Sequence, residues 1–365
     1  MTNGNSPKLY IAGMGMVTPV GGNVAMTAAA VNAGISAYRS SDFHTQNGQR
    51  ISLATVPNLI FDNIDAQIAE GDKFNERHDR VTKMAIIAIR EACSQQSITD
   101  QIPLVLAMPE VKIDSEDLAP FTYNLEQNCM PVVSAKLCRQ IHSGRAAGID
   151  AIDFAFKYLF DNSQRFILVG GSDSYSDSAM LMKLDEQNRL LTTGSADGFV
   201  PGEASSFLLL TQKPEYAIVR NGHIIALHAP GIAEESGHLL SEMKYRGDGL
   251  DKAFKKALTN RPEQSINNIY SSMNGENYWA KEFGVAQIRN HKFFQPLMKV
   301  QHPADCYGDL GSASATTLIS LAAESLFKNT TAQSHLVYSS SDGSKRGAIV
   351  IEKVMATTTQ FVSMN

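Results

Sequence analysis

Cysteine thiols are the side chains with the widest chemistry in this sequence, because a thiolate can attack a carbonyl carbon or bind a metal ion. There are four of them, at Cys93, Cys129, Cys138 and Cys306. None forms a CxxC pair or a cysteine–histidine set with the spacing of a zinc site. Four scattered cysteines in 365 residues fit reduced thiols better than a disulfide framework. We therefore expect no metal site and no cofactor in an intracellular protein.

The stretch 141–152, IHSGRAAGIDAI, places three further reactive or charged side chains beside an expected helix. His142 and Ser143 are adjacent, and neighbours in an extended chain point to opposite sides, so they make a poor catalytic pair. Helix capping or a turn is the simpler role for Ser143. Arg145 keeps its charge at every working pH, and the start of a helix is an unfavourable place for it. A buried Arg145 would need a carboxylate partner; otherwise its side chain is exposed.

Composition and charge exclude several classes of function. The chain is 43% hydrophobic and 19% charged, as in ordinary globular proteins, and its net charge of −5 gives no basic excess for nucleic acid. Residues 9–34 are largely apolar, but Pro19, Gly21 and Gly22 divide them into a strand, a turn and a helix. No uninterrupted run is long enough to span a bilayer. We expect a cytoplasmic protein that binds neither nucleic acid nor membrane.

The elements that must position these side chains alternate between strands and helices. Apolar residues recur at helical spacing in 79–96, and 102–108 is a continuously apolar strand, typical of a sheet covered on both faces. Strands are expected at 8–18, 102–108, 166–174, 205–211, 216–230, 266–275, 335–341 and 348–354, and helices at 22–34, 79–96, 148–162, 248–260, 278–287 and 312–328. Residues 109–130 are expected to be irregular, and 130–135 to form an edge or interface strand.

The alternating pattern restarts near Lys213 and Pro214. Two half-chains of similar content indicate a layered α/β fold with an internal duplication. The predicted halves are residues 1–213 and 214–365, combined in one integrated domain.

Several segments resemble the β-ketoacyl synthases, the elongating ketosynthases of the thiolase-like superfamily. The most specific is ADGFVPGEASSFLLL at 196–210, in which DGFV-x-GE precedes an apolar strand. Further similar segments, which extend the resemblance over nearly the whole chain, are YIAGMGMVTPVGGNV, DRVTKMAIIAIREA, LVGGSDSYSD and YGDLGSASA. The resemblance implies a thiolase-like five-layered α-β-α-β-α fold with two pseudo-duplicated halves.

The resemblance also implies positions for a catalytic cysteine and two histidines, and this chain departs from the pattern at all of them. The nucleophile position falls on Arg145, and the histidine positions fall on Asn274 and Gly308. A supporting lysine is replaced by Pro303, and a glycine- and phenylalanine-rich loop by SSSDGSKRGA at 339–348. The three catalytic groups of such enzymes act as a unit. We therefore expect no condensing activity.

The degenerate positions define a candidate binding pocket. Glu276 and Asp309 flank the positions of the two lost histidines, so we expect both to converge with Arg145 and Asn274 on the remnant of the active site. Arg145 is then expected at the start of the central helix, where it meets Glu276, Asp309 or a bound anion.

Two kinds of function stay open on the sequence. The first is a pseudoenzyme: a ketosynthase-like scaffold, accessory subunit or partner of an active enzyme, or of a larger bacterial assembly such as a biosynthetic or secretion cluster. The second is a 3-oxoacyl-[acyl-carrier-protein] synthase-like acyltransferase that uses Cys138, Cys306 or Ser143, or a binder of an anionic ligand around Arg145. For the two cysteines, a structural thiol is the simpler interpretation.

The resemblance suggests protein partners as well. Members of the family pair through a strand just before the nucleophile, so we expect a homodimer, or a heterodimer with a related ketosynthase, formed through PVVSA at 131–135. An acyl carrier protein or another protein is the further partner that the resemblance implies.

Overall fold

The computed structural model describes residues 7–356 except 63, 65, 70–75, 111–118 and 196. Apolar runs of the sequence form its central strands: every residue of Leu104–Met108 (β4) and of Glu203–Thr211 (β7) is buried, as expected where helices cover both faces of a sheet. Helix Glu76–Cys93 (α2) instead has one apolar face and one polar face, which is the pattern of a helix that covers a sheet from outside.

The elements fall into two successive sets. The first set comprises Lys8–Val17 (β1), Val24–Asn32 (α1), Arg39–His44 (β2), Arg50–Leu53 (β3), α2, β4, Ala119–Asn128 (α3), Cys138–His142 (β5), Ala147–Asp161 (α4), Ile167–Ser174 (β6), Ser178–Glu186 (α5) and β7. The second comprises His223–His228 (β8), Gly231–Glu234 (β9), Asp248–Ala257 (α6), Ile266–Ser271 (β10), Asn277–Arg289 (α7), Phe294–Gln301 (β11), Ala304–Tyr307 (α8), Ser314–Lys328 (α9), Ser334–Ser340 (β12) and Lys345–Met355 (β13).

The two sets repeat one sheet topology. The first sheet has the order β5-β4-β6-β7-β1 and the second the order β11-β10-β12-β13-β8. In each, the first two neighbouring pairs are parallel and the next two are antiparallel. A short antiparallel pairing of Lys8–Tyr10 in β1 with Ala226–His228 in β8 joins the sheets edge to edge.

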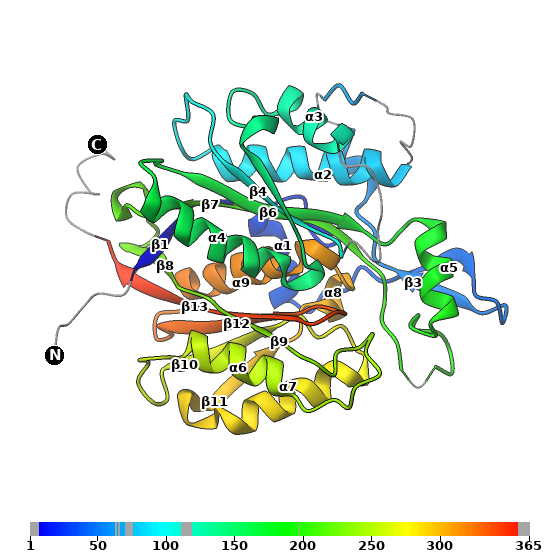
Figure 1. Ribbon diagram of the computed structural model, residues 1–365. Coiled ribbons are helices and arrows are strands. Elements are labelled where there is room, and N and C mark those ends of the chain that lie inside the picture. The colour runs from blue at the N-terminus through cyan, green and yellow to red at the C-terminus, as the bar shows by residue number, and fades with distance from the viewer. Residues whose placement is uncertain are drawn as a thin grey trace.

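The joined sheets stack as two layers among three layers of helices (Figure 1). Helices α2 and α3 cover the outer face of the first sheet, α4 and α9 lie between the sheets, and α6 and α7 cover the outer face of the second. The central helices approach closely, since a Cβ atom added to Gly148 of α4 would lie 2.9 Å from the Cβ atom of Ala315 in α9. The fold is therefore a five-layered α-β-α-β-α arrangement of two related halves.

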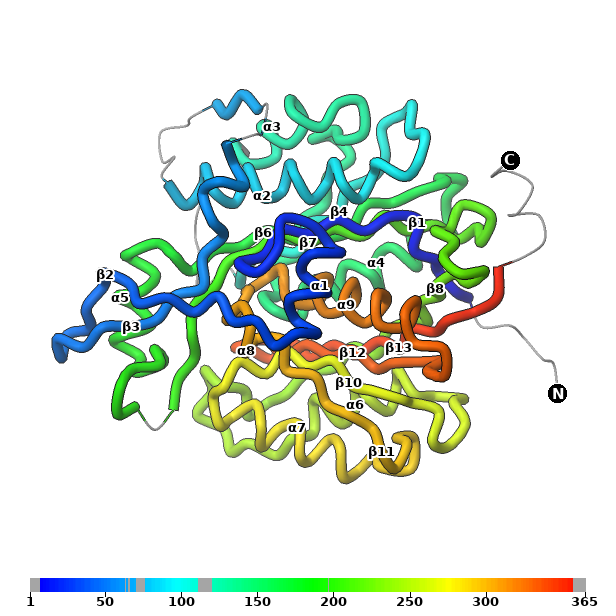
Figure 2. Tube along the Cα trace, turned by 180° about the vertical axis from the view of Figure 1, so that it is seen from behind, coloured from blue at the N-terminus to red at the C-terminus, as the bar shows by residue number. Residues whose placement is uncertain are grey.

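A smaller lobe projects from one side of the layers. It consists of the β2–β3 hairpin and α5, which lie together at that side in both views (Figure 2). The lobe has its own apolar cluster, made by Ile51, Leu181, Leu184, Leu190 and Phe199. Arg189 lies between Leu184 and Leu190 of this cluster in the sequence and is itself buried.

Several expected elements need correction. Residues 131–135 contain no strand; Met130–Pro131 is a cis peptide bond, and the edge strand is β5, which begins at Cys138. The expected irregular stretch 109–130 contains helix α3, and its residues 111–118 lie outside the described residues. The strand expected at 216–230 is limited to β8, and the elements β2, β3, α5 and β11 were not expected. The division of the chain between residues 213 and 214 stays a prediction. In chain order, the first strand of the second sheet is β8.

None of the helices in the described part of the chain combines the length and the apolar character that crossing a membrane requires. Among the same residues, no group of histidine, cysteine or carboxylate side chains is arranged to hold a metal ion.

Candidate functional site

The candidate site lies where the two central helices begin. Each helix is entered through a 3-10 turn, Gly144–Ala146 before α4 and Gly311–Ala313 before α9. Gly144 and Gly311 have φ angles of +62° and +53°, in the left-handed region that favours glycine. The turn at Arg145 is held by the end of β12 and the residue after it, because the Ala146 amide donates to Ser341 Oγ at 2.9 Å and Ser339 Oγ donates to the Arg145 carbonyl at 2.7 Å. The backbone therefore aims Arg145 into the interior.

Arg145 is fully enclosed by carboxylates and an indole ring. Its Nε donates to Asp309 Oδ2 at 2.7 Å, and its Nη1 donates to Asp342 Oδ1 at 2.6 Å. Its guanidinium carbon lies 5.1 Å from the ring centre of Trp279, a cation–π contact. Only 3% of Arg145 is exposed. Its position is thus that of a buried cation compensated by two carboxylates, rather than that of a solvent-facing side chain.

A second arginine completes the arrangement. Arg189 donates from Nε and Nη2 to the two oxygens of Glu276 at 2.7 and 2.8 Å, and from Nη1 to Asp342 Oδ2 at 2.6 Å. Its guanidinium carbon also lies 5.1 Å from the ring centre of Phe199. Asp342 therefore bridges the two arginines. We call Arg145, Arg189, Glu276, Asp309 and Asp342 the five-charge network.

Asn274 links the two ends of this network. Its Nδ2 donates to Glu276 Oε2 at 3.0 Å and to Asp309 Oδ2 at 2.8 Å, while the Glu276 amide donates to its Oδ1 at 3.1 Å. Trp279 Nε1 donates to the same Glu276 oxygen at 2.9 Å. The site residues expected from the sequence, Arg145, Asn274, Glu276 and Asp309, are thus brought together. Glu276 pairs with Arg189, however, and not directly with Arg145.

Gly308 lies beside the network but contributes no side chain. Its φ is +75°, and a Cβ atom there would lie 2.6 Å from the carbonyl oxygen of Val200. Backbone conformation and backbone contact both disfavour any larger residue at this position. A histidine therefore has no room at the second of the two positions at which the resemblance implied one.

The ionisation of the network follows from its pairing. Burial alone would raise the pKa of Asp342, but the guanidinium groups of Arg145 and Arg189 lower it well below its usual range. Burial likewise opposes the charge of Glu276, and the hydrogen bonds and charge of Arg189 lower its pKa below the usual value. Desolvation acts to lower the pKa of Arg145, but Asp309 and Asp342 outweigh it and the pKa is raised. These groups are therefore charged at neutral pH.

Little space remains around these side chains. A cavity of about 20 Å³ lies next to Arg145, Asp173 and Tyr175, and one of about 10 Å³ lies next to Asn274 and Asp309. A single water molecule needs roughly 10–15 Å³ of such volume. Neither cavity has room for an acyl chain.

The other candidate nucleophiles are not activated. Burial raises the pKa of the Cys138 thiol to about 11, and burial followed by the charge of Asp305 raises that of Cys306. Ser143 Oγ donates to Asp150 Oδ2 at 2.6 Å, whereas the His142 ring is exposed and contacts Gln140. Ser143 and His142 therefore do not form the nucleophile and general base of a serine hydrolase.

Sequence reasoning missed Arg189 and Asp342. Arg189 follows α5 in the projecting lobe, more than forty residues after Arg145 in the sequence, so no local spacing connects them. Asp342 carried a weak signal, because it lies in the loop 339–348 that departs from the ketosynthase pattern. Both this loop and position 145 depart from the ketosynthase pattern, and this shared departure was the available indication that the two lie in contact.

Solved structures match this fold over almost the entire chain, whereas no family model and no curated protein matches the sequence. The ishigamide ketosynthase/chain length factor matches with a TM-score of 0.74 at 15% identity, over 95% of this chain and 99% of that one. A ketosynthase from module 6 of the bacillaene synthase of Bacillus subtilis 168 matches with a TM-score of 0.73 at 14% identity, over 94% and 72%. The ketosynthase ApeO in complex with its chain length factor ApeC, from Xenorhabdus doucetiae, matches with a TM-score of 0.66 at 14% identity, over 97% and 100%.

These matches confirm the fold that the sequence resemblance implied. The chain has the thiolase-like fold of ketosynthases and chain length factors. At such low identity the matches concern the fold alone, and the use of the site has to be argued from its own side chains.

Proposed function

We propose that this chain is a non-catalytic, ketosynthase-like accessory subunit that works as the partner of an active ketosynthase or within a larger bacterial assembly. The five-charge network is the observation that carries the proposal. It occupies the position where the resemblance implies a nucleophile, and Arg145 at this position is held by hydrogen bonds to Asp309 and Asp342. A site filled in this way supports folding and offers no attacking group.

The state of the cysteines supports the same proposal. A cysteine nucleophile needs a lowered pKa, but burial raises the pKa of Cys93 and of Cys129 to about 12, and that of Cys138 to about 11. No described thiol therefore lies in a setting that favours the thiolate. The cavities beside the network are too small for an acyl group.

The similar solved structures support a role in an assembly. One holds a ketosynthase with its chain length factor, and another holds an acyl carrier protein of a type II polyketide synthase in complex with its ketosynthase. By this analogy, a related ketosynthase is the partner we propose first for the present chain, and an acyl carrier protein the second.

An anionic ligand at Arg145 is less well supported. Its Nη2 has no hydrogen-bond partner among the described residues, and Arg145 is one of the residues that line the 20 Å³ cavity. The network nevertheless contains two arginines and three carboxylates, so its formal charge is already −1. Both the charge and the volume favour a water molecule over an anion at this nitrogen.

Incubation with acyl-coenzyme A followed by intact-protein mass spectrometry tests the proposal. We expect no acyl adduct above the level of a sample incubated without the thioester. Variants Cys138→Ser and Cys306→Ser serve as matched controls, because each removes one thiol and leaves the network unchanged. A stable adduct on the wild-type chain that one of these variants abolishes would show acyl transfer and refute the proposal.

A further inference from the structure

The second sheet contains a buried histidine without a hydrogen-bond partner. His335 is the second residue of β12, and none of its surface is exposed. Neither Nδ1 nor Nε2 of its ring makes a hydrogen bond with any described residue. Buried polar groups of folded proteins are normally paired, so an unpaired one calls for an explanation. His335 lies outside the candidate site, and the proposed function makes no use of it.

The register of the strands places His335 in the central layer of the molecule. Side chains alternate along a strand, so His335 points to the same face of the sheet as Val337. Val337 belongs to the largest apolar cluster, which also contains residues of α9. Tyr270 of β10 belongs to this cluster too, and its ring centre lies 5.5 Å from that of His335. The histidine is therefore enclosed between the second sheet and the central helix α9.

The charged neighbour of His335 on this face has the wrong sign to accept a proton from it. His335 pairs with Ile351 of β13, so Lys353 is its diagonal neighbour on the same face of the sheet. Lys353 is itself buried, and its Nζ donates to the carbonyl of Asn329, the residue after α9, at 2.5 Å. A proton on the His335 ring would place a second buried positive charge beside that of Lys353.

The carboxylates of the elements packed against β12 are turned away or engaged. Glu352 follows Ile351 on β13 and therefore points to the opposite face of the sheet, where it accepts a hydrogen bond from Lys8. Glu324 of α9 is paired with Arg220 and Lys328. Burial raises the pKa of the Tyr270 phenol, which is therefore neutral at and below neutral pH. None of these groups balances a positive charge on His335.

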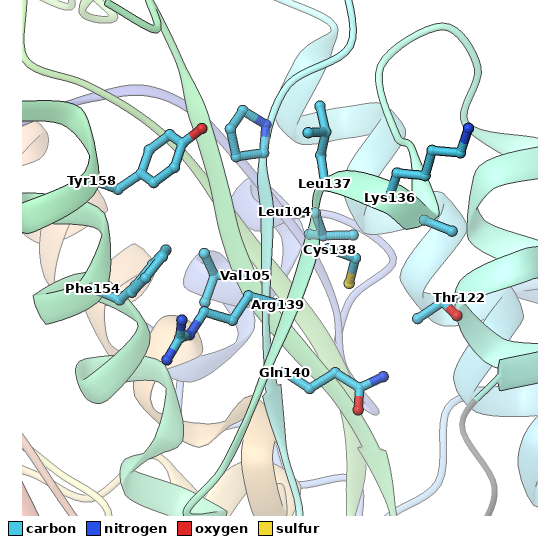
Figure 3. A pocket seen from close by; sticks show the side chains of 12 residues that line it. Leu104, Val105, Thr122, Lys136, Leu137, Cys138, Arg139, Gln140, Phe154 and Tyr158 are labelled. Atoms are coloured by element: carbon cyan, nitrogen blue, oxygen red, sulfur yellow. The ribbon is translucent and has the colours of Figure 1, made fainter. Parts of the chain in front are cut away.

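Other cations of the chain have the compensation that a protonated His335 would lack. Arg139 is exposed and stacks on Phe154, with 4.4 Å between the guanidinium carbon and the ring centre, in an open groove of about 620 Å³ along β5 (Figure 3). Arg145 is buried but is paired with two carboxylates. The ring of Tyr270 is tilted by 45° against that of His335, and such a contact does not replace the lost hydration of a buried cation.

We infer that His335 is an acid-sensitive switch: the folded chain holds its ring neutral, and protonation drives the ring out of the central layer and opens the packing of α9 on β12. Helix α9 contacts strands of both sheets, so this opening weakens the core that the two halves share. The inference goes beyond the proposed function and does not depend on it.

The direction of the pH dependence follows from the surroundings of the ring. Burial lowers the pKa of His335 from 6.5 to about 4; the backbone of Ser334 opposes this shift and the charge of Lys353 adds to it. As the pH falls, the unfolded chain takes up the proton near pH 6.5, whereas the folded chain resists it until about pH 4. The folded state is therefore favoured fully above this range and progressively less within it. From about pH 7 to about pH 5, this group alone should raise the unfolding equilibrium constant about twentyfold.

Urea denaturation of the wild type and of His335→Leu at about pH 7 and about pH 5 tests the inference. The ratio of the wild-type unfolding equilibrium constant to that of the variant should rise about twentyfold as the pH falls. The other titrating groups are common to both chains and cancel in this ratio. His335→Gln keeps a polar side chain without a titratable ring. It should show the same rise, which preserves the test if the leucine variant does not fold.

His291→Gln is the matched control, because it removes a histidine that is exposed, and its ratio to the wild type should not change with pH. Hydrogen exchange, corrected for the intrinsic effect of pH, should show that residues 318–340 of the wild type lose protection at the lower pH and that those of His335→Leu do not. A ratio for His335→Leu that stays constant would overturn the inference, and so would one that falls. Loss of protection confined to elements other than α9 and β12 would overturn it as well.

Discussion

A guanidinium group at the start of a buried helix must be compensated, and Arg145 obtains this compensation from Asp309, Asp342 and Trp279. None of these residues is close to it in the sequence. The side chain therefore acts as a connector between the two halves, because Arg145 belongs to the first half and all three partners belong to the second.

Removal of Arg145 tests this structural role. Arg145→Ala would leave Asp309 and Asp342 with unbalanced buried charge, so we expect the free energy of unfolding to fall by about 3–5 kcal/mol. Urea denaturation measures the change. A double variant, Arg145→Met with Asp342→Asn, removes one charge of each sign and should lose clearly less stability than Arg145→Ala. A loss below about 1 kcal/mol for Arg145→Ala would contradict a buried pair.

The low pKa of Asp342 predicts a dependence on pH. A carboxyl group whose pKa is lower in the folded chain than in the unfolded chain stabilises the protein above the unfolded value, about 4 for aspartate, and this contribution is lost as the pH falls. The destabilisation caused by Asp342→Asn should therefore shrink between about pH 6 and about pH 3. Because the comparison is with the wild type at each pH, titration of Glu282, whose pKa burial raises, cancels. A pH-independent difference in urea denaturation would refute this account.

At the scale of elements, the interface between β1 and α2 depends on the absence of side chains. A Cβ atom on Gly15 would lie 1.9 Å from the carbonyl oxygen of Ala88, and one on Gly13 would lie 1.8 Å from that of Ala92. Strand and helix can pack at this distance only through glycine. This explains why the apolar opening strand contains glycines at alternate positions.

Substitution in this interface is expected to be costly. Gly15→Ala should lower the free energy of unfolding by about 1–3 kcal/mol or more, because the strand or the helix must move to admit the methyl group. Gly284→Ala is the matched control: Gly284 lies within α7 and a Cβ atom there has no neighbour within 4 Å. In this helix, alanine should stabilise by up to about 1 kcal/mol. Equal effects of the two substitutions in thermal or urea unfolding would argue against the close packing.

Elements with a strong apolar pattern could be predicted from the sequence, and those stabilised by tertiary contacts could not. The expected helix 148–162 corresponds to α4, and the expected helix 312–328 to the turn before α9 and to α9 itself. Strand β11 was missed because five of its eight residues are polar, proline or highly exposed apolar residues, including Leu297 at 91% exposure. Apolar PVVSA was taken for the edge strand, whereas the more polar CRQIH forms it.

The residues of the candidate site could likewise be predicted only in part from the sequence. Positions inside segments that resemble ketosynthases led to Arg145, Asn274 and Asp309. Arg189 comes from a lobe without such a pattern, and its contact with Glu276 spans 87 residues of sequence. Contacts of this kind depend on the packing of whole elements, so the spacing of residues in one sequence does not reveal them.

At the scale of the whole molecule, the two halves share one core. The largest apolar cluster combines Leu208 and Ile149 of the first half with Leu318, Leu227 and Ile349 of the second. The ladder between β1 and β8 and the five-charge network also cross from one half to the other. Neither half can therefore lose its structure without exposing buried surface of the other.

This shared core predicts cooperative unfolding. Differential scanning calorimetry should show one transition, with a calorimetric enthalpy close to the van't Hoff enthalpy. Residues 1–213 and 214–365 expressed separately should not fold, since each would expose the central layer. Two resolved transitions, or a folded fragment by circular dichroism, would mean that the halves are independent domains.

The five-charge network also constrains how this protein can evolve. A cysteine at position 145 would leave the two buried carboxylates of Asp309 and Asp342 without this cation, at a cost of about 3–5 kcal/mol. That cost is a large fraction of the stability of a typical folded protein, about 5–15 kcal/mol. Asp309, Asp342 and Arg189 would have to be replaced in step with Arg145, through intermediates that fold poorly. The network thus disfavours a cysteine nucleophile at this helix unless several of its charged residues change together.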